Sequence, residues 1–509
     1  MKHAAGSVLL AAVLAGCGTT VPLAQQQNGG VGTGLGPSQG TGSTATGTTG
    51  LATAGDTGGL GSAGSTGTSI TAGAGSGIAD GGTGNASLPT SVAADGSHTP
   101  IKVGVVAVNY AAFAATFGVS NVNSTVFGTY QSIFAALNKQ GGMSGHPIQA
   151  TYDEVDGGAS SADAEAQRSC AKFAEDAKVA VVLSYNYISE TFSSCLAKSR
   201  IPQMDSGFFA MGDKAMARHP NLFVPDGMSM DRYMRNLLDT SVALGRLTTK
   251  DTLGVLREDC PMHNEVDAGT VQPEAKRLGI KVVESTINCY QGFSQIGNAS
   301  SQISAAVLKF RSAGVTHMTC MSASEGFCMV IFTKAASDQG YHPKYLLTSN
   351  AFPNSDSDTS QPVSYTKDQL PGMTAIGWSP LIDVGSRTKT ATPDQATAQA
   401  FCHKLDPTYG GHASDSLARD NQIAFAYGQC DSILVLKAIV ARVGTQLSMT
   451  TAFPAGYAAA APTYSPAQPT GGALSFAGGR RDGATFIMAT SWKSSCSCFS
   501  ADGPLRKVS

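Results

Sequence analysis

The sequence predicts an α/β protein of two consecutive lobes, each built around a parallel β-sheet. Three observations lead to this fold class. Strand-like apolar runs alternate with helix-like segments from residue 99 onward, which is typical of βαβ units. The alternation restarts about 150 residues after it begins. The stretch 99–509, about 410 residues, also exceeds what one hydrophobic core usually supports, so we expect two lobes.

The first lobe opens with residues 101–108, a continuous apolar run of the kind that is buried on both faces of a parallel sheet. Apolar residues at helical spacing from Val126 to Leu137 predict a helix, which Gly141-Gly142 ends. The same patterns predict strands at 146–155, 179–183 and 201–204, and helices at 162–176 and 189–199.

The second lobe begins where Thr252-Leu-Gly-Val-Leu256 mirrors Lys102-Val-Gly-Val-Val106. A predicted hairpin closes the chain around the turn Arg481-Asp482-Gly483. Between these points the predicted helices are 266–278, 303–313, 326–339, 393–405 and 421–443, and the predicted strands are 280–287, 316–320, 345–348 and 372–378; the hairpin strands are 473–476 and 485–492.

The N-terminal segment predicts export and a lipid anchor. A basic start precedes the apolar run 4–14, which is shorter than the roughly 20 residues that span a bilayer and fits a signal peptide. Ala15 and Gly16 precede Cys17, an arrangement that resembles the bacterial lipobox and implies a lipid on the Cys17 sulfur. The alternative is an ordinary secretory signal with a chance cysteine.

Residues 18–98 predict a flexible tether. They are mostly Gly, Thr, Ser and Ala, carry no aromatic residue, and have only Asp56, Asp80 and Asp95 as charged residues. Such a segment buries too little apolar surface to offset the entropy of ordering. A structured Gly-rich repeat is the alternative, but the segment has no fixed period.

The ten cysteines that follow Cys17 predict disulfides, because an even number outside the cytoplasm favours pairing. Cys496-Ser497-Cys498 is left open, since a C-x-C ring is small and strained and a metal site competes. Cys260-x-x-His263 also suggests a metal, but no paired C-x-x-C spacing supports zinc, so we expect no metal. The spacings suggest the pairs Cys170 with Cys195, Cys260 with Cys289, Cys320 with Cys328, and Cys402 with Cys430.

Charge and motifs narrow the classes of function. The 34 basic and 36 acidic residues nearly balance, which gives no electrostatic case for nucleic acid. No zinc-protease or P-loop motif is present. Ser364-x-x-Lys367 matches one hydrolase motif without its companions. We therefore expect no enzyme and no cofactor, with a secreted hydrolase as an alternative.

These features together resemble type I periplasmic binding proteins, most closely the branched-chain amino-acid (Leu/Ile/Val) binding type of ABC importers. The resemblance rests on the signal, the tether and the V-G-V or L-G-V strand that opens each lobe, and it covers about 99–509. It implies two Rossmann-like lobes with parallel sheets joined by a multi-strand hinge. The local matches are the turn at 141–148, Cys170 with Cys195 as an N-lobe disulfide, the helix at 421–430, and Asp482-Gly483.

Ligands of such sheets bind beyond the carboxyl ends of the strands, where two facing lobes form a cleft. Mixed aromatic, hydroxyl and amide side chains at these ends suit a small-molecule pocket. Further residues at these strand ends that could line the cleft are Asn109, Phe113, Asn186, Tyr187, Gly207, Phe208, Glu258, Ser324 and Ser349. The predicted ligand-binding residues are Tyr110, Ser184, Tyr185, Asp205, Ser206, Asp259, Ser322 and Asn350.

The resemblance implies an α-amino acid whose carboxylate is held by hydroxyls such as Ser184 and Ser206. An acid in the second lobe would hold the ammonium, but Asn350 stands at that strand end, and a neutral side chain cannot neutralise a buried charge. Asp205 or Asp259 are the substitutes. The aromatic residues also allow an aromatic, amide or other small organic ligand.

The expected protein is a lipid-anchored solute-binding protein on the extracytoplasmic face of the cell membrane, delivering a small ligand to an ABC transporter permease. A ligand-binding sensor of the same fold is an alternative. The expected organisation is a signal peptide (1–16), lipidated Cys17 and tether (17–98), first parts of lobe 1 (99–226) and lobe 2 (227–354), a return to lobe 1 (355–445), and a return to lobe 2 (446–509).

Overall fold

The described residues form two α/β lobes, each with its own sheet, which confirms the predicted fold class. We call the lobe around the first sheet lobe 1 and the other lobe 2. Cys17 and the expected tether up to residue 97 lie outside the described residues. The computed structural model describes residues 98–109, 126–157, 161–206, 211–289, 296–322, 325–353, 365–384, 393–408, 420–450, 452–460 and 474–508.

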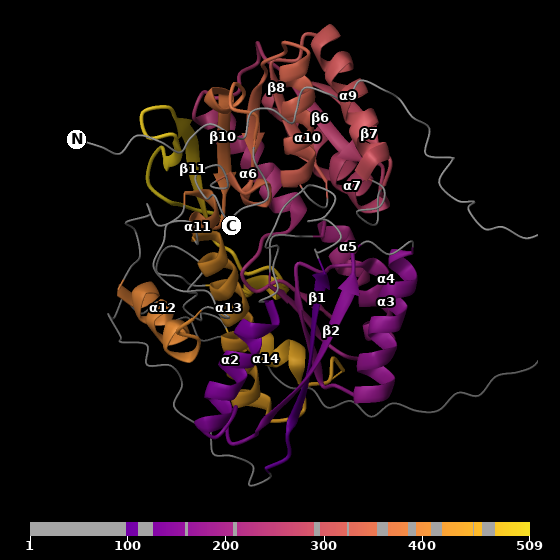
Figure 1. The fold of residues 1–509 in the computed structure, drawn as a ribbon, viewed down its shortest axis with the longest axis vertical. Coiled ribbons are helices and arrows are strands. Elements are labelled where there is room, and N and C mark those ends of the chain that lie inside the picture. Colours follow the sequence, from indigo (N-terminus) through magenta and orange to yellow (C-terminus); the bar gives the residue numbers. More distant parts are fainter. Residues whose placement is uncertain are drawn as a thin grey trace, which may run out of the picture. The chain divides into compact units, whose positions relative to one another are not determined.

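The sheet of lobe 1 is parallel throughout, with strand order β2-β1-β3-β4-β5. Helices α2 and α13 cover one face, and α3 and α4 cover the other (Figure 1). The elements are β1 (Ile101–Asn109), α2 (Val126–Lys139), β2 (Ile148–Asp156), α3 (Ala162–Ala171), β3 (Val181–Tyr185), α4 (Glu190–Lys198), β4 (Gln203–Ser206), α5 (Asp213–Arg218), β5 (Leu222–Phe223), α12 (Pro393–Leu405), α13 (Asp420–Val443) and α14 (Phe453–Ala460).

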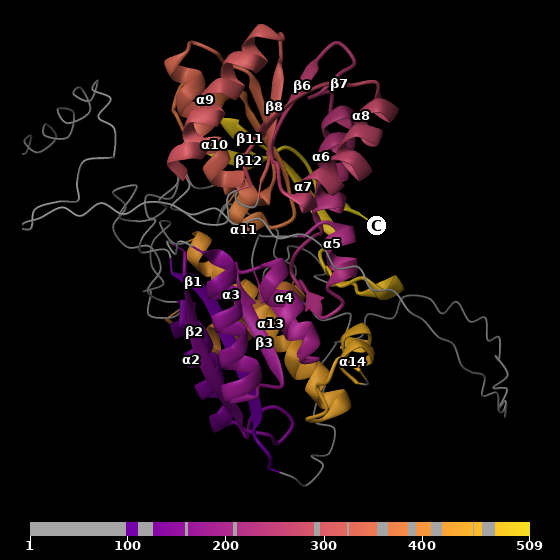
Figure 2. The ribbon, with the colours of Figure 1, turned by 90° about the vertical axis from the view of Figure 1, so that its right-hand side faces the viewer.

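The sheet of lobe 2 has the order β12-β11-β10-β9-β8-β6-β7, and β13 pairs with β11. Strands β6 to β10 are parallel, whereas β11 runs antiparallel to its neighbours. Figure 2 shows α9 and α10 on one face and α6 and α8 on the other. The elements are α6 (Met230–Ala243), β6 (Thr252–Glu258), α7 (Pro261–Val266), α8 (Gln272–Leu278), β7 (Lys281–Ile287), α9 (Ile296–Ser312), β8 (His317–Met321), α10 (Glu325–Asp338), β9 (Lys344–Leu347), β10 (Met373–Gly377), α11 (Pro380–Asp383), β11 (Phe486–Lys493), β12 (Cys498–Ala501) and β13 (Arg506–Lys507).

The repeated glycine in the opening strand of each lobe has a packing reason. A Cβ on Gly104 would lie 2.8 Å from the ring of Phe173, and one on Gly254 would lie 3.1 Å from the ring of Phe310. Each glycine therefore lets an aromatic ring pack directly against the sheet. The motif that marks the start of each lobe in the sequence marks the same contact in the structure.

The C-terminal third differs from three predictions. Residues 474–476 form no strand, so the predicted hairpin is wrong, and β11 pairs with β10 and β12 instead. Strand β10 pairs with β9 in lobe 2, although 355–445 was expected to return to lobe 1. Helices α12 and α13 make that return, because their apolar side chains complete the core on the α2 face of lobe 1. Helix α14 packs in the same core, although 446–509 was expected to return to lobe 2.

The predicted turn around Asp482 is a crossing between the lobes. Its backbone lies beside an earlier crossing, residues 224–229, through a parallel bridge between Val224 and Asp482. Val224 N–H donates to the Arg481 carbonyl at 2.7 Å, and Ala484 N–H donates to the Gly227 carbonyl at 2.9 Å. These two segments are the described part of the expected hinge.

A buried ion pair joins the two crossings. The carboxylate of Asp482 accepts from the Ser229 N–H at 2.8 Å and pairs with the guanidinium of Arg232. Arg232 also donates to the Ala484 carbonyl at 2.8 Å. Both charged side chains are less than a tenth exposed, so each depends on the other for neutralisation.

The ten cysteines after Cys17 form five disulfides. The four pairs suggested by spacing are confirmed: Cys170–Cys195, Cys260–Cys289, Cys320–Cys328 and Cys402–Cys430. The pair that the sequence left open, Cys496–Cys498, is also bridged. Neither Cys260 nor the pair Cys496 and Cys498 offers a thiolate to a metal, because Cys260 is bonded to Cys289 and Cys496 to Cys498.

Candidate functional site

The predicted ligand-binding residues fall at the carboxyl ends of strands in both sheets. Ser184, Tyr185, Asp205 and Ser206 occupy the last positions of β3 and β4 in lobe 1. Ser322 directly follows β8 in lobe 2. Asp259 and Asn350 follow β6 and β9 in the same lobe. Tyr110, Phe113, Gly207, Phe208, Ser324 and Ser364 lie outside the described residues.

One face of the lobe 1 sheet ends in a buried polar network around Asp205. The Ser184 hydroxyl donates to Asp205 Oδ1 at 2.6 Å, and the Tyr187 N–H donates to the same oxygen at 3.3 Å. The Gln203 amide donates to Ser184 Oγ at 3.0 Å. Burial raises the pKa of Asp205 to about 7, because a charged carboxylate is poorly solvated there.

The other face of the same strand ends carries Tyr185 and Ser206. The phenol of Tyr130 and the hydroxyl of Ser206 share a hydrogen bond of 2.9 Å. The Ser206 hydroxyl is also 3.3 Å from the Ser184 carbonyl. Tyr185 is 2% exposed within the core formed with α2 and α13, so its substitution would disturb packing as well as any ligand contact. Its role in binding stays a prediction.

In lobe 2 the two acidic residues at the end of β6, Glu258 and Asp259, differ in exposure. The side chain of Asp259 is 61% exposed, lies 3.7 Å from Arg257 and accepts from Asn264 at 2.8 Å. Its neighbour Glu258 is fully buried. Nearby His263 is buried too, and burial lowers its pKa to about 4, so it is neutral at pH 7.

The ends of β8, β9 and β10 enclose a second set of buried polar groups. Glu325, at the start of α10, accepts from the backbone N–H of Thr348 at 3.1 Å and from the Thr348 hydroxyl. Burial raises the pKa of Glu325 to about 8. Asn350 is buried close to the phenol of Tyr233, whose ring stacks on Trp378 with centroids 5.2 Å apart.

Ser349 fixes the end of β9 against the end of β10. Its hydroxyl oxygen accepts from the backbone N–H groups of Trp378 at 2.8 Å and Ser379 at 3.1 Å. The same hydroxyl donates to Asp383 Oδ2 at 3.2 Å. The rim of lobe 2 is therefore rigidly positioned, as a recognition surface requires.

Several polar atoms on this rim have no hydrogen-bond partner among the described residues: Ser322 Oγ, Trp378 Nε1 and Asp383 Oδ1. Apart from the Tyr233 phenol, no described group hydrogen-bonds to the amide of Asn350. A buried polar group left unsatisfied costs about 1–3 kcal/mol. Four such groups beyond three neighbouring strands indicate a place built for a polar partner.

Reasoning from the sequence did not select four residues of this buried polar group beyond β8, β9 and β10: Tyr233, Glu325, Trp378 and Asp383. Trp378 ends the predicted strand 372–378, so the rule that selected the other strand-end residues also applies to it. Glu325 was hidden because it opens a helix, where an acid is explained by the helix dipole. Tyr233 lies on α6, which was not among the predicted helices although its apolar residues recur at helical spacing.

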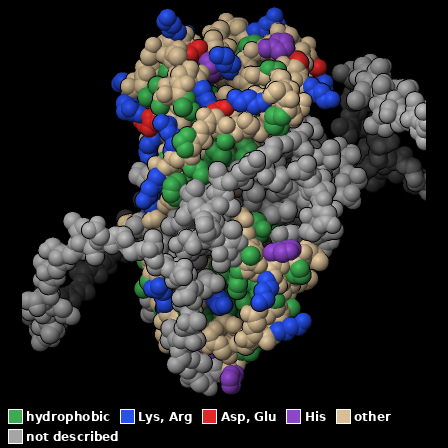
Figure 3. Space-filling model, turned by 90° about the vertical axis from the view of Figure 1, so that its left-hand side faces the viewer, with side chains coloured by type: hydrophobic (Ala, Val, Ile, Leu, Met, Phe, Trp, Pro, Cys, Tyr) green, Lys and Arg blue, Asp and Glu red, His purple; other side chains and the backbone are tan. Residues whose placement is uncertain are grey.

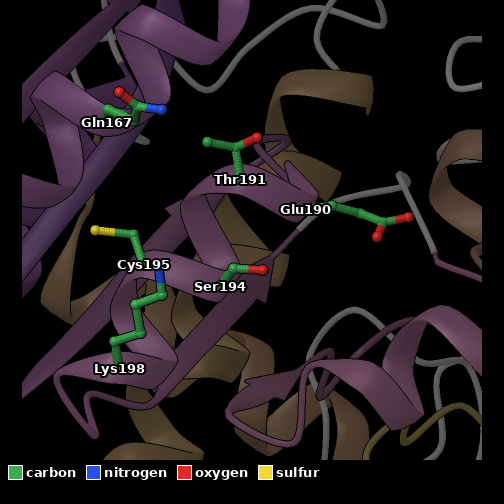
Figure 4. Close-up of a pocket in the computed structure, with 6 residues that line it drawn as sticks. All are labelled: Gln167, Glu190, Thr191, Ser194, Cys195 and Lys198. Atoms are coloured by element: carbon green, nitrogen blue, oxygen red, sulfur yellow. The ribbon is translucent and has the colours of Figure 1, made fainter. Parts of the chain in front are cut away.

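A surface depression of about 390 Å³ lies away from these strand ends, between α3 and α4. Figure 4 shows Gln167 on one helix and Thr191, Ser194 and Cys195 on the other. Because these helices cover the outer face of the lobe 1 sheet, the depression is separate from the strand-end rim. The lining residues are Gln167, Glu190, Thr191, Ser194, Cys195 and Lys198.

The surface and the helices add two further observations. On the face shown in Figure 3, Lys and Arg side chains are spread singly among other residues, with acidic ones between some of them. No helix in the described part of the chain is both long enough and apolar enough to cross a membrane.

No protein-family model and no curated protein matches the sequence. Solved structures match it in fold at low identity. A solute-binding protein of an ABC transporter from R. palustris, in complex with 4-hydroxybenzoate, is 15% identical, with a TM-score of 0.56 over 80% of this chain and 97% of its own. A fatty acid ABC transporter substrate-binding protein from Thermomonospora curvata is 14% identical, with a TM-score of 0.54 over 82% and 94%.

A branched-chain amino acid ABC transporter protein from Thermus thermophilus with bound valine is 13% identical, with a TM-score of 0.54 over 81% of this chain and 98% of its own. The match extends over nearly the whole length of each of these proteins. The chain therefore has the two-lobed type I periplasmic binding protein fold.

Proposed function

We propose that this protein is an extracytoplasmic solute-binding protein that captures a small organic ligand between its two lobes and presents it to an ABC importer. The observation that carries the proposal is the set of buried, unsatisfied polar groups beyond β8, β9 and β10. In open α/β sheets this edge is where ligands bind. The similar solute-binding structures support the same use of the fold.

The polar groups at the strand ends favour a ligand that both donates and accepts hydrogen bonds, because Trp378 Nε1–H can only donate and Ser322 Oγ can do either, and neither has a partner among the described residues. Among the described residues, Asp205 and Glu325 have no ion-pair partner, and both accept hydrogen bonds from neighbouring hydroxyls. Asn350 and Ser322 supply polar groups of both kinds. An amide, a hydroxyl compound or an amino acid fits this arrangement better than a ligand whose recognition depends on a carboxylate alone.

Substitutions at the strand ends of both lobes test the site. Ser206→Ala and Asn350→Ala should each weaken ligand binding by about 1–3 kcal/mol, because a ligand group loses its hydrogen-bond partner. The ligand is first identified by mass spectrometry of protein purified without denaturation, and affinities are then measured by calorimetry. Ser194→Ala, in the depression between α3 and α4, is the control and should leave the affinity unchanged.

The outcome of that comparison is decisive for the site. Equal affinities for wild type, Ser206→Ala and Asn350→Ala would place binding elsewhere. Small-angle scattering with and without ligand tests lobe closure, which hinge proteins of this kind undergo. An unchanged radius of gyration at saturation would contradict capture between the lobes.

The lipid anchor is proposed from the sequence around Cys17. Cys17→Ser should release the protein from the membrane fraction or block its processing, because stable anchoring requires the acyl chains that the sulfur helps to carry. Fractionation of the producing cells with immunoblotting measures this. A normally processed variant that stays with the membrane would contradict the anchor.

The buried carboxyl of Asp205 should make stability depend on pH. Its pKa is about 7 in the folded state and about 3.9 in an unfolded chain, so the folded state holds a proton that the unfolded state releases between these values. The free energy of unfolding should therefore fall as the pH rises from about 4 to 7. Asn at this position keeps an acceptor for Ser184 and cannot ionise.

Urea unfolding at pH 5 and pH 8 measures this effect. Between these two values Asp205→Asn should lose about 1–4 kcal/mol less stability than the wild type, since a full shift of about three pKa units corresponds to about 4 kcal/mol. Asp259→Asn is the exposed control and should follow the wild type. Parallel pH profiles for Asp205→Asn and wild type would contradict the assigned pKa.

A further inference from the structure

The disulfide Cys496–Cys498 lies at the tip of the β11–β12 hairpin in lobe 2. Strand β12 is at the edge of its sheet and pairs only with β11 among the described strands. The turn is closed by the pairing of Lys493 with Cys498 and by a hydrogen bond from Cys496 N–H to the Lys493 carbonyl at 3.2 Å. The backbone therefore holds this turn without help from the sulfurs.

The other four disulfides have a clear structural purpose. Each joins two different elements or the loops that follow them, over sequence separations of 8 to 29 residues. Cys170 with Cys195, for example, ties α3 to α4. The separation of Cys496 and Cys498 is 2, so this bridge closes the smallest loop and links no separate elements. Constraint of the unfolded chain, the usual benefit of a disulfide, is least here.

The two cysteine residues differ in exposure. Cys496 is exposed, and the residues on either side of it, Ser495 and Ser497, are exposed as well. Cys498 is only 2% exposed. Ser497 between them has a φ of 49°, in the left-handed region that residues with a side chain seldom adopt. The bridge is therefore open to attack from solvent on one sulfur and held in a strained turn.

We propose that Cys496–Cys498 is a thiol–disulfide exchange site whose partner is a dithiol, either a protein with paired cysteines or a small dithiol outside the cytoplasm. A partner thiolate attacks the exposed Cys496 sulfur, the Cys496–Cys498 bond breaks, and Cys498 leaves as a thiolate that takes up a proton. The partner's second thiolate then attacks the mixed disulfide and releases Cys496. The partner is oxidised to a disulfide, and this protein gains two thiols.

Graded reduction of the folded full-length protein tests the proposal. The protein is equilibrated with increasing dithiothreitol, free thiols are alkylated, and peptide mapping reports each pair. Cys496 and Cys498 should become alkylated at dithiothreitol concentrations at least tenfold lower than those required by any other pair. Reduction of Cys170–Cys195 or another pair at the same or a lower concentration would overturn the proposal.

A matched pair of variants tests the direction of attack, with oxidised glutathione as the probe. Cys498→Ser leaves the exposed Cys496 thiol, which should gain one glutathione readily. Cys496→Ser leaves the buried Cys498 thiol, which should react at least tenfold more slowly. Both variants keep the four other disulfides, and circular dichroism checks their fold. Equal rates in the two variants would overturn the assignment of Cys496 as the attacked sulfur.

Discussion

Asp482→Ala should lower the free energy of unfolding by about 3–5 kcal/mol, since it removes the carboxylate that pairs with the buried Arg232 guanidinium. The same change removes the acceptor for the Ser229 N–H. Because Asp482 lies on the later crossing and Arg232 follows the earlier one, the loss falls on the segment that joins the lobes. Urea unfolding followed by circular dichroism measures the difference.

Two controls separate this effect from a general loss of charge. Lys334→Ala removes an exposed ion pair with Asp338 on α10 and should change stability far less. The double variant Arg232→Met with Asp482→Leu should be more stable than Asp482→Ala, because both charges of the buried pair are removed together. A double variant as unstable as the single one would show that packing, and not the buried charge, sets the cost.

Removing the Cys170–Cys195 disulfide by double substitution to Ala should cost about 2–5 kcal/mol. The bridge closes a loop of 25 residues in sequence separation and joins α3 to α4 over the lobe 1 sheet. Cys170 is also fully buried in the core that contains Phe173 and Phe192, so its loss removes apolar contact as well. Thermal and urea unfolding of the oxidised proteins measure the change.

The matched control is the double substitution of Cys496 and Cys498 to Ser. Its loop is much shorter, so the chain-entropy model gives only about 1–2 kcal/mol for its loss. If the two double variants lose equal stability, the contribution of loop length is contradicted.

The sequence was most informative where periodicity and burial act together. The run 101–108 became β1, and the segment 421–443 became α13, because continuous apolar or long helical patterns leave few alternatives. Helix α6 was not predicted although Met230, Tyr233, Met234, Leu237 and Leu238 recur at helical spacing. What the local pattern could not show is that Asp231 and Arg232 are buried beside them. Their burial depends on partners far along the chain, which local patterns do not report.

The closing hairpin was mispredicted for a related reason. Arg481-Asp482-Gly483 has the composition of a tight turn, but most of its backbone hydrogen bonds go to residues 224–229, and the Ser475 N–H to Gly483 carbonyl bond of 3.0 Å does not extend into a strand pair. Gly483 is required by close approach, since a Cβ there would overlap the Pro225 carbonyl and lie 2.7 Å from the Phe476 ring. Turn chemistry and close packing select the same residue, and only the fold distinguishes them.

The candidate site was predictable to the extent that strand ends were. Ser184, Asp205, Ser206, Ser322 and Asn350 all lie at the carboxyl ends of strands, as the alternation of strands and helices indicated. The sequence could not show how deeply each of these side chains is buried. It offered Asp259 as a site acid, whereas the neighbouring Glu258 is the buried one, because burial at a strand end depends on the helix packed above it.

The placement of α12, α13 and α14 has a consequence for the order in which the polypeptide acquires structure. The core of lobe 1 joins β1, near residue 101, to helices that end at residue 460, whereas β6 to β10 of lobe 2 occupy one uninterrupted stretch between them. Contacts so far apart along the chain are slow to form, because loop closure must precede any gain from packing. Lobe 1, whose strands come first in the sequence, therefore cannot complete its core until the C-terminal helices have formed. A chain that stops before residue 420 would lack α13 and α14 from its first core, while the parallel strands of its second would all be present.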